Sequence, residues 1–268
     1  MKIGLQLISV KDVIASDLCG VIEDVGKAGY QGVEFARGFF GKTTDELKSV
    51  LDQMGMMAVG NHVYLSQLRE NLQGQIDDAK TLGMHHIVAL GGGGVSQHMG
   101  EQEIQEYIKE IRRIGQICRE QGIALAVHGS TDFYQRDGGG VLLLERVLGE
   151  IAPEYLEAQI DTAWAVCAGE DPVRLIETYK DRIYTVHIKD FHPPIPSAGD
   201  IYARKEEALT RDSAVGDNGV IDLLGVIRAS REAGAKWLIV EHMERESYED
   251  SISATRVSLG NIRNTGVI

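Results

Sequence analysis

The sequence predicts a (β/α)8 TIM barrel, and three observations favour this fold class. Short apolar runs rich in β-forming residues alternate with segments of helical periodicity eight times over. No linker or change of composition interrupts the 268 residues, and one such barrel usually has about 250 residues. A closed barrel explains this strict alternation more simply than an open doubly wound sheet. We therefore expect one domain that spans residues 1–268.

The first half of the chain carries four of the expected strand and helix pairs. Gly29 and Gly83 each follow a helical segment, and glycine commonly ends a helix. Thr43 or Thr44 can cap the second helix, with Glu46 near its start. Glycines 91–94 lack the GxxxxGK[ST] frame of a phosphate loop, so we expect a plain tight loop there. The expected strands are 3–9, 32–36, 57–63 and 86–91, and the helices are 13–28, 43–55, 66–82 and 101–121.

The second half repeats the pattern but contains one long connection. Residues Phe191 to Gly219 form a 29-residue segment with three of the five prolines. Loops of this length are usually functional, so we expect a lid that contributes little to the core. Asp171 opens the helix that follows the sixth strand. The expected strands are 123–128, 156–160, 183–186 and 236–243, and the helices are 141–149, 172–179, 220–233 and 248–261.

Composition excludes several classes of function. Forty acidic and 27 basic residues give a formal net charge of −13, which argues against nucleic acid as a partner. No apolar run approaches the roughly 18 residues of a membrane span, and the N-terminal segment does not resemble a signal peptide. The three cysteines, Cys19, Cys118 and Cys167, are widely spaced and suit free thiols. We therefore expect a cytoplasmic protein without a membrane partner.

In a barrel, the residues that end the strands face one mouth, and here they form a chemically coherent set. An acid or a histidine follows six of the eight strands, although each alone could be a helix cap or a hydrogen-bonded loop residue. Carboxylates with imidazoles suit Mn²⁺, Fe²⁺, Co²⁺ or Zn²⁺, and Mg²⁺ where imidazoles are few. The set comprises Glu34, Asn61, His62, His128, Asp161, His187, Lys189 and Glu241.

Several segments resemble the sugar phosphate isomerase/epimerase family of xylose isomerase-like barrels: GLQLISVKD, GYQGVEFA, DTAWAVCAGEDP, RIYTVHIKDF and VGDNGVIDLLGVI with WLIVEHM. This resemblance implies that Asp161 and His187 are metal ligands, that Glu241 matches the acid of the last strand, and that Glu34 and His62 lie at the substrate pocket. We count Asn61, Lys189 and Trp164 with His62 as candidates for substrate binding.

The chain departs from the family pattern after the fifth strand, where many relatives carry a glutamate ligand. Here the segment reads VHGSTDFYQ, so that His128 is kept but Gly129 and Ser130 follow it and Tyr134 stands in the place of an acid. His128 is therefore either a fourth metal ligand, which we favour, or a free base. Epimerisation by two carboxylates becomes doubtful for the same reason.

The resemblance implies a divalent-metal-dependent isomerase or epimerase that acts on a keto-sugar or related polyol through an enediolate-type intermediate. Glu241, His128 and Glu34 are the candidate catalytic residues, and Asp161, His187, Glu241 and His128 the candidate ligands, with Mn²⁺ as the preferred ion. A metal-dependent lyase, similar to inosose dehydratase or to C-glycoside-cleaving enzymes, is one alternative. A non-catalytic barrel, which would be a carbohydrate-binding or partner subunit, is the other. In either enzyme the binding partner is a small-molecule sugar or keto-sugar substrate. The sequence is also compatible with a homo-oligomer.

Overall fold

The computed structural model describes residues 1–90, 99–242 and 251–268, and these residues form the expected barrel. Eight parallel strands close in the order β1-β10-β7-β6-β5-β4-β3-β2. The predicted fold class is therefore confirmed. The barrel strands are β1 (Lys2–Gln6), β2 (Gly32–Ala36), β3 (Met57–Tyr64), β4 (His86–Leu90), β5 (Ala124–His128), β6 (Glu157–Asp161), β7 (Thr185–Ile188) and β10 (Trp237–Val240).

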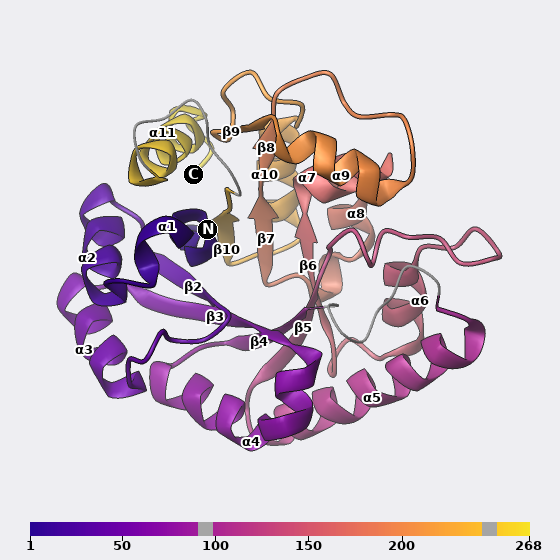
Figure 1. Cartoon of the computed structure of the whole chain (residues 1–268), viewed down its shortest axis with the longest axis horizontal. Coiled ribbons are helices and arrows are strands. Elements are labelled where there is room, and N and C mark those ends of the chain that lie inside the picture. The colour runs from indigo at the N-terminus through magenta and orange to yellow at the C-terminus, as the bar shows by residue number, and fades with distance from the viewer. Residues whose placement is uncertain (91–98, 243–250) are drawn as a thin grey trace.

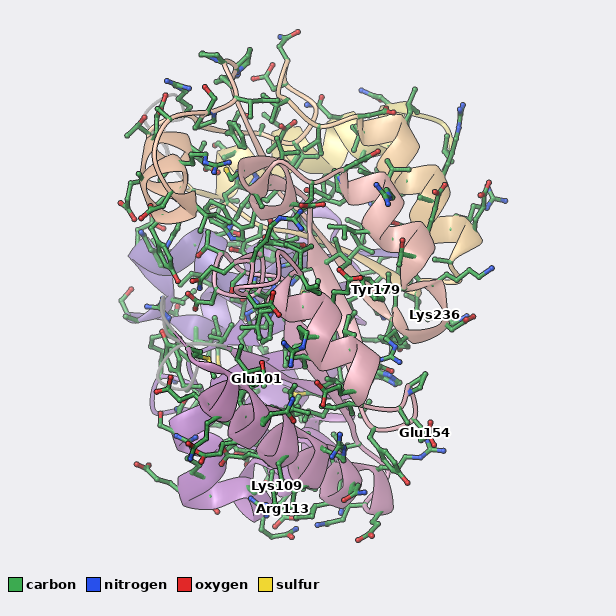
Figure 2. The ribbon with its side chains drawn as sticks, turned by 90° about the vertical axis from the view of Figure 1, so that its right-hand side faces the viewer. Glu101, Lys109, Arg113, Glu154, Tyr179 and Lys236 are labelled. Atoms are coloured by element: carbon green, nitrogen blue, oxygen red, sulfur yellow. The ribbon has the colours of Figure 1, made fainter. Side chains whose placement is uncertain are left out.

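Helices surround the strands, and α2 to α5 follow one another around the outside of the barrel (Figure 1). Each buries one apolar face, as α5 does with Ile104, Ile108 and Ile111, while Lys109 and Arg113 lie on its outer side (Figure 2). The helices are α1 (Lys11–Ile14), α2 (Leu18–Ala28), α3 (Thr44–Met54), α4 (Leu65–Leu82), α5 (Glu101–Glu120), α6 (Leu143–Glu150), α7 (Thr162–Ala168), α8 (Pro172–Thr178), α9 (Ile201–Leu209), α10 (Leu223–Glu232) and α11 (Ser251–Asn264). In the part of the chain that is described, none of them has the length and apolar character to cross a membrane.

Several element boundaries differ from the expectation, and at two of them side chains cap the backbone. The first strand ends at Gln6, whose side chain accepts a hydrogen bond from the N–H of Ile8 and starts a 3-10 turn at Leu7–Val10. The helix expected over 13–28 is divided into α1 and α2, and Asp17 caps the second. The last barrel strand ends at Val240 rather than 243. The glycines 91–94 and the expected start of the last helix, 248–250, lie outside the described residues.

The segment Phe191–Gly219 is folded rather than extended. It contains α9 and most of a small antiparallel sheet of β8 (Asp190–Phe191) and β9 (Asp212–Ser213), which lie beside α7 (Figure 1). The Asp190 carboxylate accepts backbone N–H groups from Gly216, Val220 and Ile221 at 2.8 to 3.3 Å. Phe191 and Val215 are buried. The expectation that this segment contributes little core is therefore wrong, while its role as a lid remains a prediction.

Candidate metal centre and active site

Four of the predicted strand-end residues converge at the carboxyl end of the barrel. His128, Asp161, His187 and Glu241 each offer one nitrogen or oxygen atom, and these atoms lie within 4.8 Å of one another. All four side chains are buried, and they come from β5, β6, β7 and the residue after β10. The arrangement follows from the barrel, because neighbouring parallel strands bring their carboxyl ends together.

Asp161 ends β6 and also caps α7, which explains why this unexpected helix starts there. Its Oδ1 accepts a hydrogen bond from the backbone N–H of Trp164 at 2.9 Å. Its Oδ2 is buried and has no hydrogen-bond partner among the described residues. His128 Nε2 lies 3.8 Å and Lys189 Nζ 3.9 Å from Oδ2, both beyond hydrogen-bond distance. Burial raises the pKa of Asp161 to about 6.

A buried carboxylate oxygen without a donor is unfavourable, and a cation would satisfy it. Two imidazoles and two carboxylates are a donor set that a first-row divalent metal accepts. The residues therefore fit a metal ion on the evidence of their own chemistry.

His187 and Glu241 form the other side of this group. His187 Nδ1 lies 2.8 Å from Glu241 Oε2, and the ammonium group of Lys189 donates to Glu241 Oε1. Burial opposes a charge on His187, but the carboxylates of Glu34 and Glu241 outweigh it and raise the pKa of His187 to about 10. Burial would raise the pKa of Glu241, whereas Lys189 and His187 hold it well below its usual value. Without a metal, proton and ammonium charges therefore balance these carboxylates.

The tautomer of His128 is set by Gln159, a residue that the sequence analysis did not identify. The Gln159 amide donates to Glu34 Oε1 and to Thr185 Oγ1, both at 2.8 Å, so its carbonyl oxygen is the acceptor. His128 Nδ1 lies 3.0 Å from that oxygen and must therefore donate. Burial and the nearby His187 and His62 hold the pKa of His128 well below its usual value. The neutral ring then presents the lone pair of Nε2 toward Asp161.

Glu34 lies beneath this group and is fully buried. Its carboxylate receives four hydrogen bonds or close N–O contacts. These come from Gln6 Nε2 at 2.8 Å, Gln159 Nε2 at 2.8 Å, His62 Nε2 at 2.9 Å and His187 Nε2 at 2.5 Å. Burial alone would raise the pKa of Glu34, but His62 and His187 hold it well below its usual value.

A cavity of about 260 Å³ opens above these residues. Four of the predicted site residues line it, namely His62, His128, Trp164 and Glu241. The cavity walls also contain residues that the sequence analysis missed, among them Gln6, Arg37, Asp132, Tyr202 and Lys205. Arg37 directly follows β2, and Lys205 lies on α9. No local sequence pattern marks either residue as part of a site. Only the folded arrangement brings them to the cavity.

The other predicted residues lie around the cavity without lining it. Lys189 lies below Trp164, with its Nζ 4.4 Å from the centre of the ring. Asn61 pairs with Phe35 and Ile87 in the sheet register, whereas the strand neighbour that faces the barrel interior is His62. Asn61 Oδ1 is buried and has no partner among the described residues.

The altered segment after β5 has a packing explanation. A Cβ atom at position 129 would come within 2.6 Å of the Tyr134 hydroxyl, so Gly129 allows Tyr134 to pack against the strand end. Tyr134 is buried, and its hydroxyl donates to the backbone oxygen of Asp161 at 3.4 Å. The tyrosine therefore fills space beside β6 and brings no carboxylate to the metal centre.

Comparison with known proteins identifies the family of this barrel. The family model described as xylose isomerase-like TIM barrel matches residues 22–259. The chain belongs to this family. The resemblance inferred from the sequence is thus confirmed, and the solved relatives include proteins described as sugar phosphate isomerase/epimerase.

One protein matched by sequence and two matched by structure are similar to this chain. Inosose dehydratase from Geobacillus kaustophilus is 23% identical over 82% of this chain and 78% of its own length. A sugar phosphate isomerase/epimerase from Parabacteroides distasonis has a TM-score of 0.79 at 19% identity and covers 100% of this chain and 95% of that one. The IOLI protein with a bound zinc atom has a TM-score of 0.75 at 16% identity, over 100% and 98% of the two chains. The two structural similarities show the fold alone.

Proposed function

We propose that this protein is a divalent-metal-dependent enzyme that removes a proton next to the carbonyl of a keto-sugar or related polyol. The observation that carries the proposal is Asp161 Oδ2, which has no hydrogen-bond partner among the described residues and lies with His128, His187 and Glu241, two of which line the cavity. A cavity of about 260 Å³ suits a small polar molecule better than a polymer. Membership of a family that contains sugar-modifying enzymes supports the same class of substrate.

The ion would be held by His128, Asp161, His187 and Glu241. His128 offers Nε2, and His187 offers Nδ1 because its Nε2 donates to Glu34. We propose Mn²⁺ first, with Zn²⁺, Co²⁺, Fe²⁺ and Mg²⁺ as alternatives, and the zinc-bound IOLI relative supports an ion of this kind. When bound, such an ion supplies Lewis-acid polarisation of the substrate carbonyl.

His62 is the residue that we propose to move the proton. It lines the cavity, and its Nε2 lies 2.8 Å from Gln159 Oε1 and 2.9 Å from Glu34 Oε2. A proton on Nε2 leaves the lone pair of Nδ1 free to act as a base. Glu34 then acts as a positioning residue that orients His62 and His187, because its own oxygens are occupied by four donors.

The carboxylates near the cavity are engaged in other contacts, and this favours elimination of water over epimerisation by two carboxylates. Glu34 is saturated with donors, Glu241 pairs with Lys189, and the cavity residue Asp132 accepts the Tyr202 hydroxyl at 2.6 Å. Elimination needs one base and one acid, which His62 and a nearby donor can supply. The similarity to inosose dehydratase supports this order, so we place the dehydratase before the isomerase or epimerase that the sequence ranked first. Isomerisation that uses one base remains the second candidate, since His62 alone satisfies it.

A panel of keto-inositols and keto-sugars tests the proposal. The metal-free protein is incubated with each compound in D₂O, with and without Mn²⁺, and the ion is chelated before proton NMR and mass spectrometry. Metal-dependent exchange of one C–H for deuterium is the expected result. Loss of water then identifies the dehydratase, and an isomer of unchanged mass identifies the isomerase. A protein that holds no stoichiometric metal and exchanges no C–H would instead be a non-catalytic barrel, either a carbohydrate-binding or a partner subunit.

A further inference from the structure

A second cluster of histidines and a carboxylate lies at the opposite, amino end of the barrel. His86 opens β4, His85 precedes it, and Glu157 opens β6. His85 Nε2 is 2.7 Å from Glu157 Oε1, and His86 Nδ1 is 3.1 Å from Glu157 Oε2. Figure 2 marks this end at its right-hand side by Glu154, which lies shortly before β6, and Lys236, which precedes β10. The proposed reaction uses none of these residues.

Both imidazole rings are held in place by groups outside the cluster. The His85 ring stacks on Tyr184, with the ring centres 3.6 Å apart and an angle of 13° between the planes. His86 is fully buried, and its Nε2 faces Glu34 Oε1 at 3.6 Å. A carboxylate that receives the other ring N–H is the usual partner of a metal-bound histidine, because it fixes the tautomer. In the metal-free cluster His86 Nδ1 donates to Glu157 Oε2, and the 3.6 Å contact leaves Nε2 without a hydrogen-bond partner among the described residues. A metal ion would displace the Nδ1 proton and leave a proton on Nε2, which faces Glu34.

We propose that His85, His86 and Glu157 form a second transition-metal site, for which Zn²⁺ is the best-fitting ion. The three ligand atoms already lie within 4.8 Å of one another. In a tetrahedral zinc site with Zn–N bonds of 2.0–2.1 Å, ligand atoms are roughly 3.3 Å apart. The two His–Glu157 separations of 2.7 and 3.1 Å therefore need to open slightly, and a pair as far apart as 4.8 Å would need to close by about 1.5 Å. The side chain of His85 is 36% exposed, which gives the ion a path from solvent and leaves a position for water.

The site would act on the fold rather than on a substrate. β5 lies between β4 and β6 in the barrel, so an ion shared by their first residues ties three consecutive strands together. The competing explanation is a hydrogen-bonded cluster without metal, in which protonated histidines balance Glu157. The two explanations differ in the number of zinc ions that the chain binds.

Zinc stoichiometry separates them. The full chain is freed of metal with a chelator, titrated with Zn²⁺, passed through a desalting column and analysed for bound zinc by mass spectrometry. We expect two equivalents in the wild type, one in His85→Gln, one in Asp161→Asn and none in the double variant. Glu154→Gln removes a charge from the same end and is the matched control, which should keep both equivalents, since Glu154 is exposed.

Thermal unfolding gives an independent readout in the Asp161→Asn background. Zinc at 100 times its Kd should raise the Tm by roughly 5 °C, and by nothing once His85→Gln is added. Glu157→Gln tests the same site if His85→Gln folds poorly. The proposal would be overturned if the wild type bound one equivalent of zinc and His85→Gln kept it. It would also be overturned if His85→Gln and Glu157→Gln each bound two equivalents of zinc. Two equivalents in Asp161→Asn with one in His85→Gln would uphold this site and count against the proposed active site.

Discussion

The two ends of the barrel carry similar clusters, and each holds one buried polar atom without a hydrogen-bond partner among the described residues, His86 Nε2 at the amino end and Asp161 Oδ2 at the carboxyl end. At the amino end, both oxygens of Glu157 accept hydrogen bonds from His85 and His86. At the carboxyl end, Asp161 Oδ2 has no partner among the described residues, and the group borders a cavity. Histidines and acids in proximity therefore do not by themselves indicate catalysis. What distinguishes the carboxyl-end cluster is that His128 and Glu241 line a cavity that a small molecule can enter, whereas His85, His86 and Glu157 do not line it.

Glu34 connects the two clusters. Its Oε2 contacts His62 and His187 at the carboxyl end, which we call the upper end. Its Oε1 faces His86 at the amino end, which we call the lower end, at 3.6 Å. Glu34 therefore holds the rings of the carboxyl-end cluster at hydrogen-bond distance and lies close to His86 at the amino end without a hydrogen bond to it. The two ends can be compared by variants that remove a group from one, from the other, or from the link between them.

The largest effect is expected from Asp161→Asn at the upper end. The amide keeps the oxygen that caps α7 but removes the charge at Oδ2, so metal and turnover should be lost together. We expect kcat to fall by roughly 10³-fold or more, because the bound ion contributes several kcal/mol to the reaction. The Tm of the metal-free protein should not fall, since an unpaired buried carboxylate is removed.

Asp171→Asn is the matched control for this prediction. Asp171 caps α8 through the N–H of Val173 in the same way but lies outside the cavity. Its asparagine variant should keep both activity and metal, as measured by steady-state kinetics and elemental analysis. Normal metal content in Asp161→Asn would remove this residue from the ligand set.

Glu34→Gln, which changes the link, should affect stability and catalysis together. Four donors point at this carboxylate, and an amide group would turn its own N–H donors toward some of them. We expect the free energy of unfolding in urea to fall by about 3 kcal/mol. Turnover should fall by about 10- to 100-fold through misorientation of His62 and His187.

Glu110→Gln is the control for Glu34→Gln, since it also neutralises a paired glutamate. Glu110 pairs with Arg69 near the surface, where such pairs contribute less than about 1 kcal/mol. Its unfolding free energy and turnover should stay close to the wild type. If Glu34→Gln is equally mild, the network around Glu34 is not what positions the histidines.

The sequence predicted the barrel and the strand-end residues because both depend on local pattern. Hydrophobic periodicity locates strands, and β6 and β7 deliver Asp161 and His187 to one rim whatever the side chains between them. The sequence pattern could not predict the role of Gln159. Its amide group connects Glu34, His62 and His128 across the barrel interior. Such contacts depend on which side chains face one another after closure. Gly129 is another example, because its small size is explained only by the position of Tyr134.

Tyr202→Phe tests the wall of the upper cavity and should have an intermediate effect. The Tyr202 hydroxyl donates to Asp132 Oδ1 at 2.6 Å and accepts from Gln135 Nε2 at 2.7 Å, which fastens α9 over the cavity. Its removal should lower the unfolding free energy by about 1 kcal/mol. KM should rise by about 5- to 10-fold with a smaller change in kcat, because binding rather than the proton transfer is weakened. Tyr155→Phe, which lies before β6 at the other end, should change neither quantity.

The smallest effect on turnover is expected from His85→Gln at the lower end. His85 lies at the amino end of the barrel, where changes affect stability more than chemistry, and it contacts Tyr184 and Glu157 rather than the cavity. His86 keeps its position facing Glu34 in this variant, so the orientation of His62 and His187 should persist. We expect kcat and KM within about threefold of the wild type, measured with saturating Mn²⁺, even where zinc binding at the lower end is lost. A larger loss of kcat, with the upper metal still bound, would show that the lower cluster acts on the active site through His86 and Glu34, and that the two ends are not independent.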